Sequence, residues 1–261
     1  MNDIEQKYFN YIDEYFSADK IVDRFYHYTD IGALINGIIP EYAEQGKEVC
    51  MRATHAKFLN DPEEIKRGID FLTEVFEKNH KNDEFLSSIS KYNGNSFLIS
   101  FTQEKDSLPM WTTYANKSTG VAIGFERLKS LSFTDLVLKC WYDIGELSEL
   151  IEQYIHLGKK KVDPILYIFC LPQIYKDKAY EYEKEIRLIG EFKDLPTKFR
   201  EKNGYIIPYK EVFFAKEQIK SMTLGPCQNM DNAEYSLRQF LDSRGFEHVE
   251  IKRSEIPYRN I

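Results

Sequence analysis

The chain has 261 residues, of which 43% are hydrophobic and 15% aromatic, as expected of a folded globule rather than a disordered chain. Its formal net charge of −7 argues against wrapping long stretches of duplex DNA by counterion release. The N-terminus shows no apolar signal core, and no stretch approaches the ~20 apolar residues of a membrane span. The 4 cysteines lack metal or redox spacing. We therefore expect a cytoplasmic protein with no membrane partner.

The hydrophobic pattern predicts one α+β domain that covers residues 1–261. Helix starts are indicated at Asp61 and Asp231, because each begins a capping-box pattern that ends in a glutamate. The expected elements, in chain order, are an amphipathic helix at 2–16 (within 1–18), a strand at 24–29, a helix at 31–38, a strand at 51–59, a helix at 61–79, a strand at 95–102, a short helix at 107–115, strands at 120–125 and 137–142, a mostly helical stretch at 145–178, strands at 184–192, 205–208 and 219–224, a helix at 231–245 and a strand at 249–252.

Several common site motifs are missing from the sequence. There is no Gly-x-Gly-x-x-Gly after a predicted strand and no Gly-x-x-x-x-Gly-Lys-Ser/Thr, which argues against Rossmann and P-loop nucleotide sites. The 5 histidines are scattered without close pairing, so we expect no metal site. No Gly-x-Ser-x-Gly elbow supports a serine hydrolase.

Two short segments, Tyr26-His27-Tyr28-Thr29 and Glu183-Lys184-Glu185-Ile186-Arg187, place polar side chains on predicted strands. Strand alternation would put Glu183, Glu185 and Arg187 on one face. Each residue has an ordinary reading: a structural histidine, aromatic packing residues, and surface glutamates paired with lysines. Taken together, they predict a pocket. The candidate site residues are His27, Tyr28, Thr29, Trp111, Tyr114, Glu183, Glu185 and Arg187.

Such a pocket suits substitution at the anomeric carbon of a ribose. A carboxylate that holds a ribose hydroxyl can stabilise an oxocarbenium-like transition state, as paired carboxylates do in glycosidases. Aromatic rings can stack on a planar leaving base and shield the cation from water. A histidine can fix a ribose hydroxyl through one ring nitrogen.

Five spaced motifs resemble an uncharacterised bacterial domain family across nearly the whole chain: Tyr26-His27-Tyr28-Thr29, Asn60-Asp61-Pro62-x-Glu64, Trp111-x-x-Tyr114-Ala115, Gly120-x-x-Ile123-Gly124-Phe125 and Tyr182-Glu183-Lys184-Glu185-x-Arg187. That family in turn remotely resembles ADP-ribosyltransferases of the His–Tyr–Glu class. The resemblance implies a split, mostly antiparallel sheet that forms an NAD cleft with helices packed around it. It also implies a toxin or phage-defence setting for some members, with an antitoxin protein as a partner.

The resemblance implies that NAD is the co-substrate and that ADP-ribose is passed to a macromolecule. His27 and Thr29, with Tyr28, would hold the dinucleotide, while Tyr114 and Trp111 would stack. Glu185 would be catalytic, and Glu183 would orient or deprotonate the acceptor. Because Glu183 adds the Glu-x-Glu pattern of the arginine-modifying class, the roles of the two carboxylates stay open. Arg187 would pair with a phosphate or a carboxylate.

Two other functions fit the same residues: an NAD glycohydrolase that uses water as the acceptor, and a non-catalytic nucleotide- or protein-binding module. For the transferase, we expect a nucleic-acid acceptor (RNA or DNA) slightly ahead of a protein. The reason is the basic run Lys159-Lys160-Lys161, followed by Lys176, Lys178 and Lys184. Such a run can attract a phosphate backbone locally.

Overall fold

The computed structural model describes residues 18, 23–44, 47–61, 63–79, 96–126, 136–157, 171–227 and 229–257. The expected N-terminal helix and the run at 159–161 lie outside these residues. The strands are β1 (Arg24–Thr29), β2 (Val49–His55), β3 (Phe97–Thr102), β4 (Val121–Glu126), β5 (Leu136–Lys139), β6 (Glu185–Gly190), β7 (Lys198–Lys202), β8 (Tyr205–Phe214), β9 (Ile219–Leu224) and β10 (Glu250–Arg253). The helices are α2 (Ile31–Ala33), the π-helix η2 (Leu34–Ile38), α3 (Glu64–Lys78), α5 (Leu108–Tyr114), α6 (Ile144–Leu157), α8 (Met230–Ser243) and the 3-10 helices η3 (Ala56–Phe58), η4 (Leu171–Gln173), η5 (Lys178–Glu183) and η6 (Lys216–Gln218).

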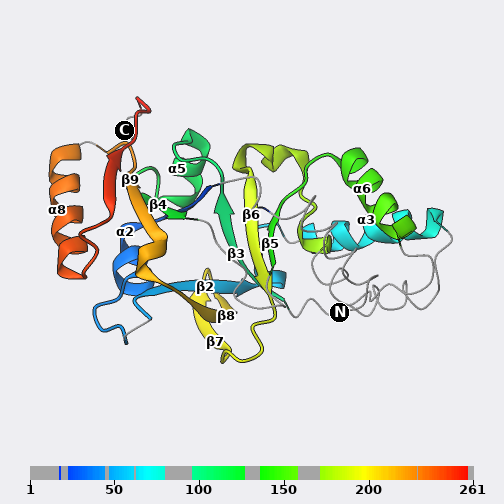
Figure 1. Ribbon diagram of the computed structural model, residues 1–261, viewed down its shortest axis with the longest axis horizontal. Helices are drawn as coiled ribbons and strands as arrows, with labels where there is room; N and C mark the ends of the chain where they lie inside the picture. Colours follow the sequence, from blue (N-terminus) through cyan, green and yellow to red (C-terminus); the bar gives the residue numbers. More distant parts are fainter. Residues whose placement is uncertain are drawn as a thin grey trace.

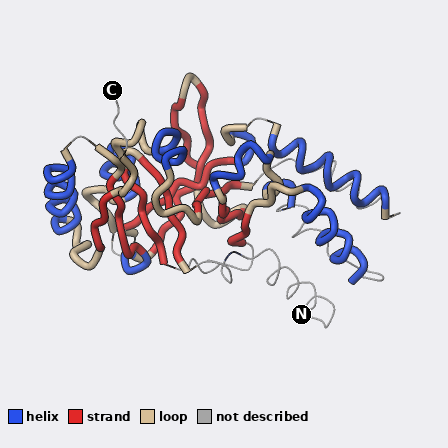
Figure 2. Tube along the Cα trace, turned by 90° about the horizontal axis from the view of Figure 1, so that it is seen from above, coloured by secondary structure: helices blue, strands red, loops and turns tan. Residues whose placement is uncertain are grey.

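The α+β class and the mostly antiparallel sheet are confirmed. Ten strands form one sheet in the order β10-β9-β4-β1-β3-β2-β8-β7, with β6 on β3 and β5 on β6. Every pair of strands is antiparallel except β10 with β9. In Figure 1, α8 lies at one end of the molecule, and α3 and α6 lie at the other. Figure 2 shows the strands between these two groups of helices.

Strand β3 has an edge that is shared by two other strands. Along its full length it pairs with β6 on one edge. On the other edge, β1 joins it through Tyr26 and Thr102, while β2 joins it through Leu98 and Phe97. Two strands that pair with opposite ends of one edge must diverge, because neighbouring strands otherwise lie only ~4.8 Å apart along a ladder. The middle of the β3 edge therefore faces an opening between β1 and β2.

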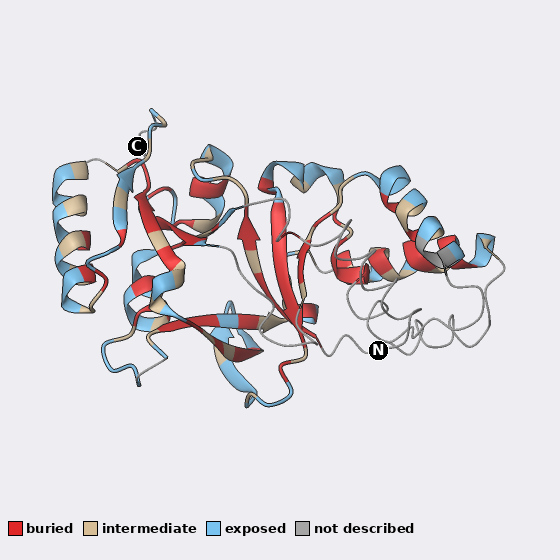
Figure 3. Ribbon diagram, viewed as in Figure 1, coloured by how far each residue is buried: buried red, intermediate tan, exposed pale blue. Residues whose placement is uncertain are grey.

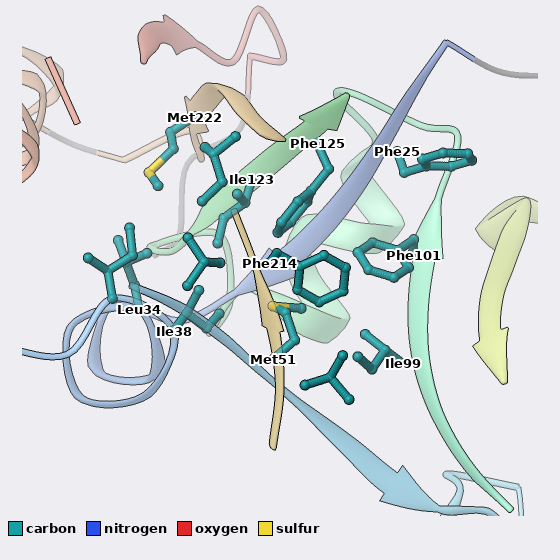
Figure 4. Close-up of a cluster of buried hydrophobic side chains, with 14 of the residues drawn as sticks. Phe25, Leu34, Ile38, Met51, Ile99, Phe101, Ile123, Phe125, Phe214 and Met222 are labelled. Carbon is teal, nitrogen blue, oxygen red and sulfur yellow. The ribbon is translucent and has the colours of Figure 1, made fainter. Parts of the chain in front are cut away.

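The largest apolar cluster packs inside the curved sheet. Its side chains come from facing strands, with Phe25 and Phe125 from β1 and β4, and Met51 and Phe214 from β2 and β8 (Figure 4). A second cluster lies under α3 and α6 against β3, β5 and β6. All residues of β6 are buried, and Figure 3 shows this strand in the colour of buried residues. A strand buried on both faces can hold charged groups only if they are paired.

Several predicted elements differ in the structure. Helix α3 begins at Glu64, with Glu63 at the N-cap, because Asp61 binds the Glu63 amide and Arg67 instead. Within the stretch expected to be mostly helical at 145–178, α6 covers Ile144–Leu157, and residues 158–170 lie outside the described residues. From Leu171 the chain forms the 3-10 helix η4 and then a β-bridge at Tyr175 in place of an α-helix. The hairpin partner β7 was not expected, although the turn Asn203-Gly204 has φ values of 53° and 80° that favour a tight hairpin.

Candidate functional site

The candidate site is a cavity of about 100 Å³ where β1, β3 and β6 meet α3, α5 and η5. It lies at the opening on the β3 edge. The lining residues are Tyr26, His27, Tyr28, Leu59, Asn60, Asp61, Glu64, Ser100, Phe101, Thr102, Met110, Tyr114, Lys176, Tyr180, Glu183, Glu185 and Arg187. Six of the eight predicted site residues are among them, and Thr29 and Trp111 are not.

Glu185 and Arg187 form the centre of a buried charge network. Arg187 donates from Nε to Glu185 Oε1 at 2.9 Å and from Nη2 to Oε2 at 2.8 Å. Its Nη1 donates to the Glu64 carboxylate and to the Gln173 carbonyl. The Arg187 side chain is 1% exposed. Of the two partners predicted for Arg187, a phosphate or a carboxylate, the structure therefore places carboxylates against it.

Lys176 bridges the two glutamates that the sequence singled out. Its Nζ donates to Glu185 Oε2 at 2.6 Å and also to Glu183 Oε2. Burial would raise the pKa of Glu185, but the charges of Arg187 and Lys176 outweigh it and lower that pKa to about 2. Burial would lower the pKa of Lys176, yet Glu185 and Glu183 raise it above its ordinary value. Both groups are therefore charged at neutral pH.

Glu183 has fewer partners than Glu185. Its Oε1 accepts a hydrogen bond of 2.6 Å from the Tyr114 hydroxyl, and its Oε2 accepts from Lys176. Asn60 Nδ2 in turn donates to the Tyr114 oxygen at 3.4 Å. Burial and the Glu183 carboxylate raise the pKa of Tyr114, so this phenol keeps its proton. Glu183 is thus held by a neutral phenol and by one cation, Lys176, which it shares with Glu185.

The backbone brings Glu183 and Glu185 together in a way that differs from the prediction. Glu183 is the last residue of η5, and β6 begins only at Glu185. Lys184 between them has φ 38° and ψ 53°, in the left-handed region, which turns the chain from the helix into the strand. The prediction that one strand carries both carboxylates is wrong, but both side chains reach the same cavity.

The segment before η5 is tied to the sheet, which places Lys176. Trp141 forms a parallel bridge with Tyr175. The Lys176 amide donates to the Trp141 carbonyl at 2.9 Å, and the Trp141 amide donates to the Ile174 carbonyl at 2.7 Å. Lys176 Nζ also lies 4.9 Å from the centre of the Tyr180 ring, within cation–π range. Lys176 is therefore part of the buried site and not of a surface basic patch, which corrects the predicted patch.

His27 lies on β1 with its ring at the opening of the β3 edge. Its Nδ1 is 2.9 Å from the Ser100 carbonyl oxygen. Because a carbonyl only accepts, Nδ1 carries the proton, and Nε2 of the neutral ring is an acceptor with no hydrogen-bond partner among the described residues. Burial lowers the pKa of His27, against the smaller opposite effect of the Ser100 hydrogen bond. A neutral histidine is therefore available to accept a hydrogen bond from a ligand hydroxyl.

Three predicted residues have largely structural contacts. Tyr28 lines the cavity, but its hydroxyl donates to the Glu104 carbonyl and accepts from the Ser107 amide. Trp111 is 0% exposed and donates from Nε1 to Asp106 at 2.6 Å, with its ring edge-on to Tyr28. Thr29 is buried and lies outside this cavity, but it lines a second, adjoining one. Trp111 therefore has no surface on which a ligand ring could stack.

Glu64 and Lys176 are site residues that the sequence reading did not assign. Glu64 appeared to be a helix-start residue, and it is buried against Arg187 from the first turn of α3. Gly68, one turn later, allows α3 to approach η4, because a Cβ there would meet the Pro172 carbonyl oxygen at 2.1 Å. A glycine in the middle of an amphipathic helix was the one available signal of this close contact.

The network has an excess of negative charge. Three carboxyl groups, from Glu64, Glu183 and Glu185, share the two cations Lys176 and Arg187. Asp61 also lines the cavity and has its own partner, Arg67. Among the described residues there is no group of three or more metal-binding side chains, nor any helix long and apolar enough to cross a membrane. The formal charge of this site favours a cationic ligand or transition state.

A comparison with known protein families gives a match for part of the chain. Residues 110–188 match a family described as a protein of unknown function, DUF2971. This stretch includes Tyr114, Lys176, Glu183, Glu185 and Arg187, whereas His27 and Glu64 lie before it. Neither the curated proteins nor the solved structures gave a match. No link to the ADP-ribosyltransferases emerges from these comparisons. What they show is that residues 110–188 are similar to this family of unknown function.

Proposed function

We propose that this protein cleaves NAD at the bond between nicotinamide and ribose and transfers ADP-ribose to a macromolecule. The observation that carries the proposal is the excess of carboxylates over cations beside an aromatic-lined cavity. Departure of nicotinamide leaves positive charge on the ribose. A preorganised anion in a partly buried site stabilises such charge much better than water does.

Within this proposal, Glu183 is the carboxylate that faces the substrate. Glu185 accepts two hydrogen bonds from Arg187 and one from Lys176, so its charge is balanced by two cations. Glu183 contacts one cation, Lys176, which it shares with Glu185, so more of its negative charge is left for a ribose hydroxyl or for the developing cation. Glu185 and Arg187 position Lys176, which in turn orients Glu183. This division of roles favours Glu183 over Glu185, a choice that the sequence left open.

The size of the cavity limits which part of NAD it can hold. Its volume of about 100 Å³ is well below the ~300 Å³ of a typical small-molecule site. It therefore admits the reacting end of the substrate only. We propose that Tyr114 and Tyr26 flank the nicotinamide and that His27 Nε2 accepts from a ribose hydroxyl. The opening between β1 and β2 would be the NAD cleft of a split sheet.

The described lysines do not mark a binding surface for a nucleic-acid acceptor. Lys176 lends no support to a nucleic-acid acceptor, because it is buried and paired with glutamates. Lys178 is exposed, and Lys184 is exposed and paired with Glu104. A toxin or phage-defence role, with an antitoxin partner, stays a prediction of the family resemblance.

The test is to incubate the protein with NAD labelled in the adenylate half, with and without a cell extract, and to follow the label. We expect nicotinamide release together with label on a macromolecule, which nuclease or protease digestion then assigns to nucleic acid or protein. Free ADP-ribose alone would make the protein a glycohydrolase. Absence of nicotinamide release under all conditions would refute cleavage and leave a binding module.

A further inference from the structure

A second cavity, of about 280 Å³, adjoins the first. His27, Leu59, Asn60 and Ser100 line both cavities, so the two meet at the opening along β3. The charged side chains that line the two cavities are of opposite sign. The first is lined by four acidic side chains, whereas the described residues that line the second include no Asp or Glu. The second instead has three cations, Arg52, Arg200 and Lys202.

The strand register explains why these cations share one surface. Arg52 and Thr54 lie on one face of β2, and Thr54 is opposite Tyr209 of β8. Across the β7–β8 hairpin, Arg200 is opposite Ile207, two residues from Tyr209. Because residues two apart on a strand and residues opposite each other across a ladder share a face, the side chains of all three strands converge here.

The two arginines have little to neutralise them. Arg52 and Arg200 have their guanidinium carbons 5.3 and 5.7 Å from the centre of the Tyr209 ring. Arg200 Nη2 donates to the Thr54 hydroxyl at 2.9 Å, while its buried Nε has no hydrogen-bond partner among the described residues. Glu211, the nearby carboxylate on β8, is taken by Lys198 at 2.7 Å. Among the described residues no carboxylate forms an ion pair with either arginine, although Glu211 lies opposite Arg52 across β2 and β8. Two cations beside one ring form a site for an anion.

We propose that this cavity binds the phosphate groups of a dinucleotide whose N-glycosidic end enters the carboxylate cavity. The identity of that end rests on the proposed function; the anion site itself does not. A dinucleotide with a cationic base and a pyrophosphate matches the two cavities, negative at one and positive at the other. Together the cavities come within the ~300–1,000 Å³ of small-molecule sites. Arg52 and Arg200 bind the phosphates, and Lys202 adds positive charge at the rim.

The experiment measures binding to the full-length protein by calorimetry with four probes: ADP-ribose, inorganic pyrophosphate, adenosine and a single-stranded oligonucleotide. The variants are Arg52→Gln and Arg200→Gln, with Lys198→Gln as the matched control. Lys198 lies on the same face of β7 as Arg200, but its charge is already paired with Glu211. Circular dichroism and thermal melting establish that each variant is folded.

We expect each arginine variant to weaken ADP-ribose and pyrophosphate binding by ~10-fold or more, as loss of a charge-assisted hydrogen bond does. Adenosine binding should not change, and Lys198→Gln should bind all probes as the wild type does. Unchanged ADP-ribose affinity in both folded arginine variants would overturn the proposal. So would an arginine-dependent affinity for the oligonucleotide with none for ADP-ribose, because the ligand would then be a polynucleotide.

The outcome can be separated from that of the proposed function. If ADP-ribose binding depends on the arginines but nicotinamide is never released, the second cavity binds the phosphates and the proposal of NAD cleavage is refuted. If nicotinamide is released with the same KM by the wild type and by both arginine variants, the protein cleaves NAD and the proposal of a phosphate site in the second cavity is refuted. Glu183→Gln should keep the affinity for pyrophosphate, because Glu183 does not line the second cavity.

Discussion

Arg187 and Glu185 lie two residues apart on β6 and meet in a two-point ion pair, with distances of 2.9 and 2.8 Å. Both side chains are almost fully buried. A buried pair of this kind costs desolvation energy, so its presence is weak evidence for stability alone. It fixes the position of the Glu185 carboxylate and, through Lys176, that of Glu183. The pair is best explained as the support of a site.

Arg187→Met should strongly destabilise the protein. The substitution leaves Glu64 and Glu185 buried without their shared cation, and breaking a buried pair costs ~3–5 kcal/mol. Urea unfolding followed by circular dichroism measures this. Lys198→Met is the control, because it removes an exposed pair worth ~1 kcal/mol or less. Equal effects of the two substitutions would show that the network is not held as described.

Acid should remove the stability that Glu185 contributes. Its pKa is about 2 in the folded protein against an ordinary value of 4.5, so the unfolded state takes up the proton first as pH falls. The contribution is complete above pH 4.5 and is lost between pH 4.5 and 2. Urea unfolding at several pH values in this window should show a steeper loss for the wild type than for Glu185→Gln. Parallel curves would contradict the lowered pKa.

His27→Asn distinguishes the structural role of the His27 ring nitrogen Nδ1 from the proposed ligand-binding role of Nε2. The Asn amide nitrogen can replace Nδ1 as donor to the Ser100 carbonyl, but nothing replaces Nε2. We expect a melting temperature near that of the wild type and a KM for NAD raised by ~10-fold, the value of one lost hydrogen bond to a ligand. If the affinity for NAD is unchanged while stability falls, His27 is structural.

Trp111→Phe tests whether Trp111 is a structural residue and not one that stacks on the ligand. The substitution removes the donor to Asp106, whose carboxylate also binds Ser254 and Glu255 near the end of the described chain. Loss of one hydrogen bond to a charged acceptor costs ~1.5–3 kcal/mol, so we expect a lower melting temperature. The KM for NAD should stay the same in the folded protein, because Trp111 does not line the cavity. A raised KM with unchanged stability would restore its predicted stacking role.

Sequence reasoning found the side chains whose polarity conflicts with their surroundings. Glu185 and Arg187 lie in an apolar strand, and His27 interrupts an aromatic one, so each was noticeable without a structure. Glu64 and Lys176 were not, because a glutamate at a helix start and a lysine near other lysines have ordinary local explanations. Only the close approach of α3 at Gly68 and the bridge at Trp141 bring them to the site. Such contacts are tertiary and leave little local trace.

The same limit explains the errors in the fold. The β7–β8 hairpin was missed because Lys198–Lys202 has no apolar alternation, being exposed along most of its length. Trp111 was assigned to the site because an aromatic residue on a short helix can face either a cavity or the core. The helix starts predicted at Asp61 and Asp231 differ by a few residues from those in the structure. Which side chain caps a helix depends on tertiary packing, which the local sequence does not show.

We propose that Glu183 stabilises the ribose cation. The rate of nicotinamide release by the Glu183→Gln variant tests this role directly. Glu181→Gln is the matched control, since Glu181 lies on the same helix and is exposed. We expect a fall of ~100-fold or more for Glu183→Gln, equal to about 3 kcal/mol, and wild-type activity for Glu181→Gln. Full activity of a folded Glu183→Gln protein would contradict it.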